Sequence, residues 1–350
     1  MAWDRIAKST FFIRMFNWEY WPFGVVQFPL FFYYPWLSLR ARSFTFFAAS
    51  NPGILMGGMF GESKYDVLKL IPGDLIPGTI RITAPSDSVS LQSQLRNAGL
   101  SFPLIFKPDI GERGFMVRRI NTVREAELYL QQMPHDFLAQ ELVDLPLEFG
   151  VFYSRHPDTE KGSVTSVVMK EMLCVTGDGK STLEQLILAK PRAKLQWHIL
   201  KIRYKDELGQ ILPKDKVKEI VSIGNHCLGT KFINANHLIT DRLTNSFDRI
   251  SKAIPGFYFG RFDLRCATVD DLQDGRVKIL ELNGCGAEPA HIYDPRFSFW
   301  RAVGVLVQHW RTIFEIARAN AERGTRDIPL KEAMKHYRTF KQKTRPARLS

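Results

Sequence analysis

The chain has 350 residues, of which 45% are apolar, and its formal net charge is +12. This apolar content excludes a disordered chain and is enough to bury a core, so we expect a globular protein of about two or three domains. The four cysteines are too far apart for a CxxC metal site or a disulfide framework, and charged residues near the start argue against a cleavable signal peptide. We therefore expect a reducing compartment, the cytoplasm.

Residues 1–50 form an aromatic segment that is unlike the rest of the chain, because the first 47 residues carry 17 of the 43 aromatic side chains. The stretch 20–39 is uncharged and long enough to span a bilayer, but its prolines and Gln27 argue against a regular helix, so we exclude a transmembrane helix. Tryptophan and tyrosine favour the membrane interface, which predicts insertion there with Arg40 and Arg42 at headgroup level. The alternative is a folded aromatic layer that covers a sheet or forms a dimer contact.

Residues 51–100 are glycine-rich at their start and read as a connector, with a short helix expected at 62–71 before Pro72. Residues 101–320 alternate short strands with helices, which predicts α+β structure. A helix capped by Asn121 or Thr122 should end at Pro134, a second helix should lie near 243–254, and a long one should cover 299–320. The predicted strands are 104–109, 137–143, 150–155, 164–173, 259–269 and 277–283.

Residues 321–350 form a basic tail, because from residue 322 onward nine Lys or Arg stand against three acidic residues. An anionic membrane surface attracts such a tail by up to about 1 kcal/mol for each basic side chain. Lys331, Lys335 and Arg338 recur at helical spacing, so the alternative is a solvated helix with one basic face. Nucleic acid is the less favoured partner, since the aromatic and basic residues are not interleaved.

The most informative pattern is a pair of predicted strands, 259–265 and 277–283. Side chains alternate along a strand, so Arg261, Asp263 and Arg265 share one face of the first strand. Glu281 and Asn283 share one face of the second. These polar faces predict a common site if the two strands pair.

The pairing follows if the polar segment 270–275 is a hairpin loop centred on Leu272. Asp263 then lies opposite Glu281, and Asn283 lies opposite an arginine. Two carboxylates and an amide oxygen suit Mg²⁺, with Mn²⁺ as an alternative, and the arginine suits a phosphate. An isolated pair of this kind is also typical of an amphipathic hairpin with a solvated charged face.

A second motif lies upstream, where Lys107 ends a predicted strand and precedes a loop with Gly111 and Gly114. Glycines let backbone N–H groups approach phosphates, and a lysine ammonium is a compact charge suited to bridging them. The loop lacks the Walker A order, and the alternative for Lys107 is a strand lysine that faces water. Further on, the segment 140–143 leaves a strand and Glu148 follows it, a spacing that suits a hinge beside a nucleoside.

In this order the motifs resemble the ATP-grasp family, as in D-alanine:D-alanine ligase, cyanophycin synthetase and glutathione synthetase. The likeness extends over residues 63–317, and the segment 175–186 resembles cyanophycin synthetase in particular. The resemblance implies an ATP-grasp fold of two α+β subdomains that clasp ATP. Residues 51–100 then form a short region before the ATP-grasp body, 101–320. The family usually places a Rossmann-like domain there, which this chain lacks the length to match.

The resemblance also implies roles for individual residues. Lys107 and Arg261 stabilise the transferred phosphate, and Lys170 contacts the reacting acid or phosphate, with a solvated strand lysine as its alternative. Lys64 is the alternative to Lys69 for a further family lysine. The implied metal ligands are Asp263, Glu281 and Asn283. The implied nucleotide-binding residues are Lys107, Gly111, Arg113, Gly114, Gln140, Glu141, Leu142, Val143, Glu148 and Lys69.

The implied reaction is phosphorylation of a small-molecule carboxylate by ATP, followed by attack of an amine on the acylphosphate to give an amide. Such a ligase needs no protein nucleophile, and the glycines around Cys285 favour a substrate loop over a nucleophile. The alternatives are an ATP-dependent phosphotransferase on the same fold and a non-catalytic nucleotide-binding scaffold at a membrane. The aromatic start and basic end favour an amphiphilic substrate and a peripheral place on the inner face of the membrane.

Overall fold

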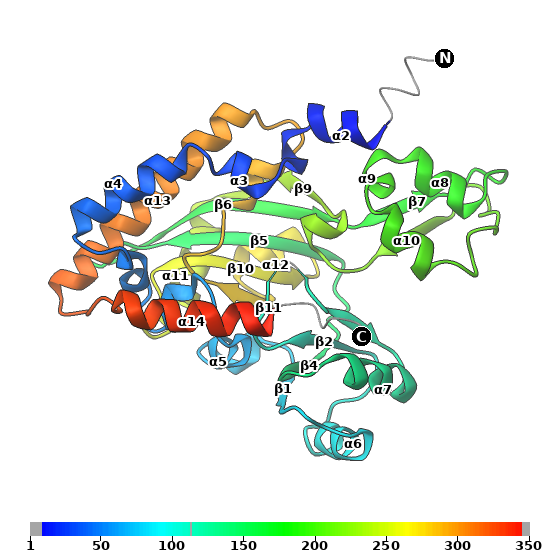
Figure 1. The fold of residues 1–350 in the computed structure, drawn as a ribbon, viewed down its shortest axis with the longest axis horizontal. Helices are drawn as coiled ribbons and strands as arrows, with labels where there is room; N and C mark the ends of the chain where they lie inside the picture. Colours follow the sequence, from blue (N-terminus) through cyan, green and yellow to red (C-terminus); the bar gives the residue numbers. More distant parts are fainter. Residues whose placement is uncertain (1–8, 113, 345–350) are drawn as a thin grey trace.

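The computed structural model describes residues 9–112 and 114–344. Its described strands form three antiparallel sheets, with the helices packed around them (Figure 1). The small sheet has the order β1-β4-β2-β3, the central sheet has the order β11-β10-β5-β6-β9, and the third sheet pairs β7 with β8. The α+β fold class that the sequence predicts is therefore confirmed.

The small sheet is covered by two helices. Its strands are β1 (Thr79–Ile82), β2 (Leu104–Pro108), β3 (Arg118–Ile120) and β4 (Phe137–Glu141). Helices α6 (Ser88–Asn97) and α7 (Val123–Gln132) pack on it. The Thr122 side chain caps α7, as the sequence predicts. β1 and α6 lie within residues 51–100 but belong to this sheet and its core.

The central sheet is buried on both faces. Its strands are β5 (Leu147–Ser154), β6 (Ser163–Glu171), β9 (Lys231–Asn234), β10 (Phe259–Cys266) and β11 (Lys278–Asn283). One face packs against α11 (Asp241–Lys252), where Phe247 meets Phe262. The other packs against α13 (Phe299–Glu322), which extends the long helix expected there. Alternation along the strands therefore supplies two cores.

The link between β10 and β11 is a helix, so the prediction of a polar hairpin loop at 270–275 is wrong. Helix α12 (Val269–Asp274) is capped by the Thr268 side chain, which accepts a hydrogen bond from the backbone N–H of Asp271. It ends at Gly275, whose positive φ of 73° favours glycine. The N-cap residue Thr268 and the C-cap residue Gly275 enclose one short helix, and burial of Leu272 stabilises it.

The third sheet carries a lobe of short helices. It consists of β7 (Leu173–Thr176) and β8 (Val217–Val221), so the strand predicted at 164–173 is divided between β6 and β7. Helices α8 (Leu183–Ala189), α9 (Pro191–Lys194) and α10 (Trp197–Arg203) pack against this pair. The lobe lies to the right in Figure 1.

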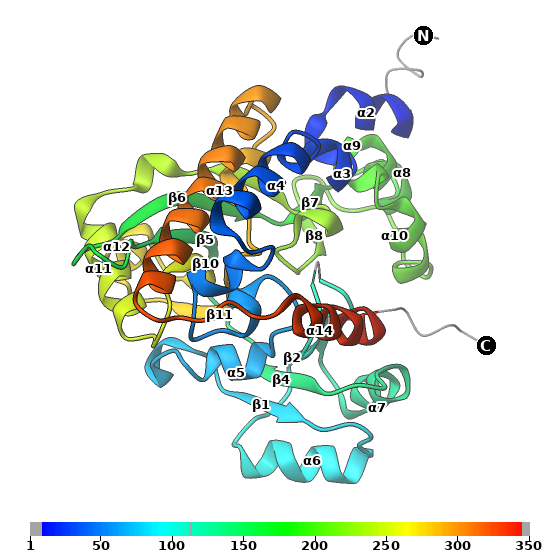
Figure 2. The ribbon, with the colours of Figure 1, turned by 60° about the vertical axis from the view of Figure 1, so that its left-hand side comes forward.

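As the sequence predicts, the stretch 20–39 is not one regular helix, but the aromatic segment is made of several short helices. It contains α2 (Thr10–Phe16), α3 (Phe23–Val26) and α4 (Leu30–Ala41). Pro22 and Pro29 occupy N-cap positions, where a missing N–H breaks no helical hydrogen bond. Pro35 lies inside α4, which is held by burial of Leu37 and by packing along α13 (Figure 2).

No helix in the described ranges is both long and apolar enough to cross a bilayer. The tail contains α14 (Leu330–Lys343), in agreement with the helical spacing of its basic residues. Helix α5 (Lys64–Leu68) is shorter than the helix expected at 62–71. Short 3-10 helices are η1 (Trp18–Tyr20), η2 (Phe46–Ser50), η3 (Leu55–Gly58), η4 (Gly73–Leu75), η5 (His226–Leu228), η6 (Asn236–Leu238) and η7 (Ala290–Tyr293).

Candidate active site

The paired strands β10 and β11 have the register that the sequence predicts. Asp263 lies opposite Glu281, and Arg261 lies opposite Asn283. A register shift between Asp263 and Leu264 adds an extra residue to β11, which bends the pair beyond the polar positions. Arg261, Asp263, Glu281 and Asn283 therefore lie together on one side of this register shift.

Asp263 is the centre of a buried ion-pair network. Arg261 Nη2 lies 3.0 Å from Asp263 Oδ2, and Lys170 Nζ from β6 lies 3.0 Å from Asp263 Oδ1. Lys170 also lies 3.1 Å from Glu148 Oε1 on β5, and Arg265 Nε lies 2.9 Å from Glu148 Oε2. Cations and carboxylates from three adjacent strands therefore alternate across one face of the central sheet.

Two lysines from outside the central sheet complete this cluster. Lys107 on β2 donates from Nζ to the backbone oxygen of Leu280 at 2.9 Å and to Gln140 Oε1 at 3.0 Å. Lys64 at the start of α5 lies 3.3 Å from Glu281 Oε1 and donates to the backbone oxygen of Gly111. The cluster thus joins the small sheet, α5 and the edge strand of the central sheet.

Burial and charge act in opposite directions on the titratable groups here. Burial works to raise the pKa of Asp263, but Arg261 and Lys170 outweigh it and lower that pKa to about 2. Burial lowers the pKa of Lys107 to about 8, although the Glu281 carboxylate works against this. Desolvation raises the pKa of Glu62, whose Oε2 has no hydrogen-bond partner among the described residues.

The glycine loop after β2 packs between α5 and the third-sheet lobe. Gly111 accepts from Lys64, as noted above, and Gly114 has a φ of 72°. A Cβ at Gly114 would lie 3.0 Å from Asn225 Nδ2 and 3.1 Å from Leu228 Cδ1, so η5 leaves room for little more than glycine. Arg113 lies outside the described residues.

The segment expected to meet the nucleoside, 140–143, covers the end of β4 and the two residues after it. Gln140 lies beside Lys107, while Glu141 is tied to the small sheet through a 3.1 Å hydrogen bond from the Gly78 N–H to Oε2. Leu142 leads to Val143, whose backbone oxygen accepts from Arg265 Nη1 at 3.1 Å. The segment therefore connects the small sheet directly to the charged face of the central sheet.

Of the two lysines considered for the further family position, the structure brings Lys64 into the cluster. Lys69 lies at the C-cap of α5, is exposed, and has its ammonium 5.4 Å from the Tyr65 ring centroid. Sequence spacing alone could not separate them, because both belong to one short helix. Arg265 and Glu62 were not assigned a role from the sequence. The available signal for Arg265 was that strand alternation puts it on the same face as Asp263.

The strand end that carries Asn283 is fixed by a close backbone approach. Cys285 donates its N–H to the backbone oxygen of Gly57 at 2.9 Å. A Cβ at Gly58 would lie 2.6 Å from Gly284 Cα, so this approach requires glycine. Cys285 itself is buried, and burial raises the pKa of its thiol, which leaves no basis for a nucleophile there.

The loop after β11 also contacts the aromatic segment. Gln27 donates to Glu288 Oε1, and Tyr293 donates to Glu288 Oε2 at 2.5 Å. Arg261 Nη1 donates to the backbone oxygen of Glu288 at 3.0 Å. The N-terminal helices therefore support one wall of the cluster rather than lying apart from it.

The predicted metal ligands Asp263, Glu281 and Asn283 lie within this network. Within the described ranges, no group of three or more His, Cys, Asp or Glu side chains is arranged to hold a metal ion. Asp263 and Glu281 nevertheless face each other, and Asn283 Nδ2 lies 3.0 Å from Asp263 Oδ2. Two carboxylates and an amide fit Mg²⁺ in chemistry, since this ion takes few protein ligands and keeps other positions for phosphate and water.

The chain was compared with known proteins. No protein-family model matches it, and no curated protein matches it. It is similar to a solved structure of D-alanine–D-alanine ligase from Bacillus anthracis, at 15% identity and a TM-score of 0.45, over 77% of this chain and 72% of that one. It is also similar to the corresponding ligase from Coxiella burnetii, at 10% identity and a TM-score of 0.41, over 82% of this chain and 62% of that one.

A third solved structure is a bifunctional glutathione synthetase from Pasteurella multocida, at 14% identity and a TM-score of 0.36. The match covers 70% of this chain and only 36% of the synthetase. These are ligases of the kinds that the sequence motifs resemble. Because the identities and TM-scores are low, the functional proposal rests on the residues of this chain.

Proposed function

We propose that the chain is an ATP- and Mg²⁺-dependent carboxylate–amine ligase of the ATP-grasp type. The observation that carries this proposal is the 2.9 Å contact between Lys107 Nζ and the backbone oxygen of Leu280. It brings a buried lysine from the small sheet next to Glu281 on the central sheet. A nucleotide held between two sheets needs such a junction, because its phosphates require cations from one side and metal ligands from the other.

The charge of the cluster suits phosphate groups. Its basic side chains come from the small sheet, α5 and the central sheet, and they are Lys64, Lys107, Lys170, Arg261 and Arg265. Its carboxylates are Glu62, Glu148, Asp263 and Glu281, and burial raises the pKa of Glu62, which favours its neutral form. Burial strengthens each charge–charge interaction relative to water. The glycine loop with Gly111 and Gly114 supplies backbone N–H groups on the same side. The segment 140–143 and Glu148 are the residues we assign to the nucleoside.

Asp263, Glu281 and Asn283 are the residues we assign to hold Mg²⁺, with Mn²⁺ as an alternative. When bound, the ion neutralises part of the negative charge of the ATP phosphates. Lys64, Lys170 and Arg261 neutralise the two carboxylates in the described contacts. On nucleotide binding, these cations are free to turn toward phosphate oxygens while the carboxylates accept the metal.

The chain's own work in the reaction is positioning and charge neutralisation. ATP phosphorylates the substrate carboxylate, and an amine attacks the acylphosphate to release phosphate and form an amide. Lys107, Lys170 and Arg261 offset the charge that grows on the transferred group. Water must be kept from the acylphosphate, and the buried position of Lys107 and Asp263 is consistent with a closed site.

An ADP-release screen tests this proposal. The full chain is incubated with ATP and Mg²⁺ and with carboxylic acids crossed with amines, and Glu281→Gln serves as the blank. We expect ADP only when an acid and an amine are both present, an amide product, and a loss of more than about 100-fold in Glu281→Gln. A stable phosphoester product identifies a phosphotransferase instead. Nucleotide binding without ADP release under any mixture identifies a scaffold and overturns the proposal.

We further propose that the enzyme works in the cytoplasm, peripherally on the inner face of a membrane, and that its acid or amine is amphiphilic. Exposed aromatic side chains on α3 and α4 and the basic helix α14 support this placement. Gln27, in the same aromatic segment, reaches Glu288 beside Arg261. An amphiphile held at the membrane surface would thus lie near the catalytic wall.

A further inference from the structure

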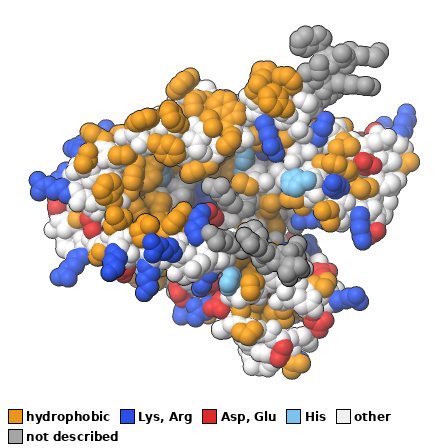
Figure 3. All heavy atoms as spheres, viewed as in Figure 1, with side chains coloured by type: hydrophobic (Ala, Val, Ile, Leu, Met, Phe, Trp, Pro, Cys, Tyr) orange, Lys and Arg blue, Asp and Glu red, His pale blue; other side chains and the backbone are white. Residues whose placement is uncertain are grey.

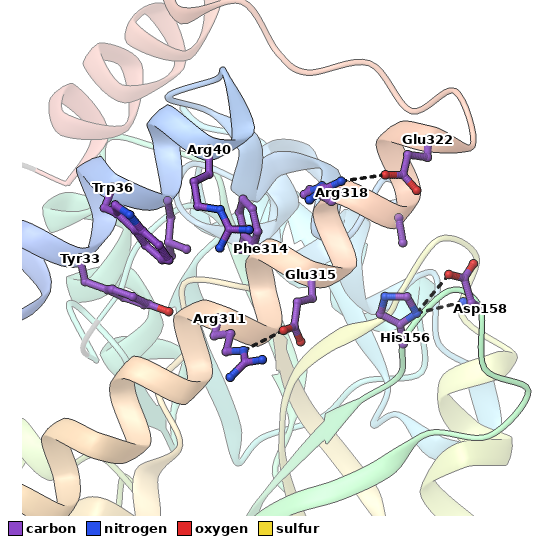
Figure 4. Close-up of a pocket in the computed structure, with 12 residues that line it drawn as sticks. Tyr33, Trp36, Arg40, His156, Asp158, Arg311, Phe314, Glu315, Arg318 and Glu322 are labelled. Atoms are coloured by element: carbon purple, nitrogen blue, oxygen red, sulfur yellow. Dashed lines mark hydrogen bonds and ion pairs between the residues drawn. The ribbon is translucent and has the colours of Figure 1, made fainter.

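A groove of about 550 Å³ lies between α4, α13 and the turn after β5 (Figure 4), and no residue of the ion-pair cluster is part of its lining. Its α4 wall is aromatic and basic, with Tyr33, Trp36 and Arg40. Its α13 wall presents Phe314 with charged side chains on either side. The volume is that of a small-molecule site rather than of a packing defect.

Arg40 is the cation of this groove that lacks a carboxylate partner among the described residues. Its guanidinium carbon lies 4.9 Å from the Trp36 ring centroid and 5.4 Å from that of Phe314, so two aromatic rings hold it in place. The other charged groups of the lining are paired: Arg311 with Glu315 at 2.8 Å, Arg318 with Glu322 at 3.2 Å and His156 with Asp158 at 3.6 Å. Arg40 is therefore positioned to receive an anion.

The surface beside the groove is apolar and exposed. Phe31 is 57% exposed, Phe32 is 70% exposed and Leu39 is 73% exposed, all on α4. Figure 3 shows hydrophobic side chains spread over α3, α4 and α13 on this side of the molecule. A water-soluble surface rarely exposes so many large aromatic residues together, which indicates that something covers them.

Two candidates for what covers this apolar surface are a lipid bilayer and a second copy of the chain, and the charge of the surface distinguishes them. Figure 3 shows Lys and Arg side chains along α14 on the same side of the molecule as the apolar surface. Two copies placed face to face would oppose these cations and Arg40, in a chain with a net charge of +12. An anionic lipid surface complements them and accepts the aromatic rings at its interface.

We propose that the groove between α4 and α13 binds the anionic headgroup of a membrane lipid, with Arg40 as its ligand and with Phe31, Phe32 and Leu39 inserted beside it. This inference rests on the membrane placement proposed above and adds a specific site to it. The headgroup phosphate meets the Arg40 guanidinium, and the acyl chains run along the exposed face of α4.

Vesicle flotation of the full chain tests the site. The vesicles are phosphatidylcholine alone, or phosphatidylcholine and phosphatidylglycerol in equal parts, at low and high salt. Arg40→Gln is compared with Arg96→Gln, which removes the same charge from an exposed position on α6. Phe32→Ser is compared with Val89→Ser, which removes an exposed apolar side chain from α6.

We expect the wild type to bind the anionic vesicles, Arg40→Gln to weaken that binding about fivefold and Phe32→Ser to weaken it about tenfold. The two α6 variants should bind like the wild type. If wild type binds but Arg40→Gln and Arg96→Gln lose affinity equally, the groove is not a headgroup site although the membrane placement stands. If wild type binds neither vesicle, both proposals fail, and self-association seen by sedimentation then identifies a second copy as the cover.

Discussion

At the scale of single residues, Asp263 shows how a charge is kept in a buried place. Burial alone would raise its pKa, but Arg261 and Lys170 each approach one of its oxygens at 3.0 Å. Asn283 adds a hydrogen bond to the same carboxylate at 3.0 Å. Removing one member of such a network leaves the other charges buried without a partner. The resulting loss in the free energy of unfolding is larger than the contribution of a surface ion pair.

The first expected outcome concerns acid stability. Asp263 has a folded pKa of about 2 against an ordinary value of 3.8, so its ionised form contributes stability above about pH 4 that is lost as the pH falls toward 2. The contribution is on the order of 2 kcal/mol. Asp263→Asn should therefore lower the free energy of unfolding at neutral pH, and the difference from wild type should narrow below about pH 4.

Urea unfolding at a series of pH values measures this difference. Asp206→Asn is the matched control, because Asp206 is exposed and lies on the third-sheet lobe. The control should follow the wild type throughout. A constant difference between Asp263→Asn and wild type across the acid range would show that the ion pairs do not hold the carboxylate ionised.

The second expected outcome concerns Lys107. Burial lowers its pKa to about 8, so its ammonium loses its proton as the pH rises through that value. If Lys107 binds phosphate, ATP affinity should fall above about pH 8 in the wild type, because the deprotonated amine no longer attracts the anion. Lys107→Arg should remove this dependence, since an arginine stays charged.

Titration calorimetry measures this pH dependence of the ATP affinity. The range from pH 7 to pH 9 extends about one unit to either side of the Lys107 pKa. Lys69→Arg makes the same substitution on the exposed lysine of α5 and should keep the wild-type profile. An affinity that stays constant up to pH 9 in the wild type would remove Lys107 from the phosphate site.

At the scale of elements, the β10–β11 register was predictable because two constraints agreed. Alternation fixed which side chains share a face, and the short connection fixed which residues face each other. The connection itself was not predictable as a loop, because Thr268 and Gly275 are helix signals that depend on burial of Leu272. Local pattern thus gave the pairing but not the shape of the link.

The contacts between distant segments had no such local signal. Lys64 and Lys69 have the same charge on the same helix, and only the packing of α5 against β11 selects Lys64. In the aromatic segment the prolines rightly argued against one continuous helix, but the short helices between them were not predicted, because Pro22 and Pro29 serve as N-cap residues of α3 and α4. Glu19 is a third contact without a local signal. It is a lone acidic residue among aromatic residues, and its partners Arg192 and His226 lie in the third-sheet lobe.

Glu19 provides the third expected outcome. Its Oε2 lies 2.6 Å from Arg192 Nη2 and 2.9 Å from His226 Nε2, which ties η1 to α9 and η5. Burial opposes its ionisation, but His226 and Arg192 together lower its pKa. Glu19→Gln should lower the free energy of unfolding by about 3 kcal/mol, because it leaves Arg192 buried without its partner.

Denaturant unfolding measures this change, and Glu322→Gln is the control. Glu322 pairs with Arg318 on the exposed surface of α13, so its loss should cost less than about 1 kcal/mol. Adding Arg192→Met to Glu19→Gln should restore part of the lost stability, since the unpaired charge is then gone. Equal costs for the two single variants would show that the Glu19 network does not connect the aromatic segment to the lobe.

At the scale of the whole molecule, the chain is organised around junctions between sheets rather than around one core. The small sheet has its own hydrophobic cluster, although Leu138 of β4 packs into the cluster of the central sheet. Lys107, Lys64 and the segment 140–143 add polar contacts between the two sheets. Polar junctions are easier to open than apolar ones, because water can replace their hydrogen bonds. A ligand bound across such a junction therefore stabilises the molecule as a whole.

The fourth expected outcome follows from this arrangement. ATP with Mg²⁺ at about 100 times its dissociation constant should raise the free energy of unfolding by about 2.7 kcal/mol, because it binds only the folded chain. ATP without the metal should give a smaller rise, since Lys107 and Arg261 then meet phosphates whose charge no metal shares. Glu281→Gln should lose the metal-dependent part and keep the rest, whereas Arg96→Gln on α6 should behave as wild type. Thermal unfolding with ATP alone, with Mg²⁺ alone and with both together measures these differences. If ATP stabilises the wild type equally with and without Mg²⁺, Asp263 and Glu281 do not bind a metal beside the nucleotide, which contradicts their assignment as metal ligands.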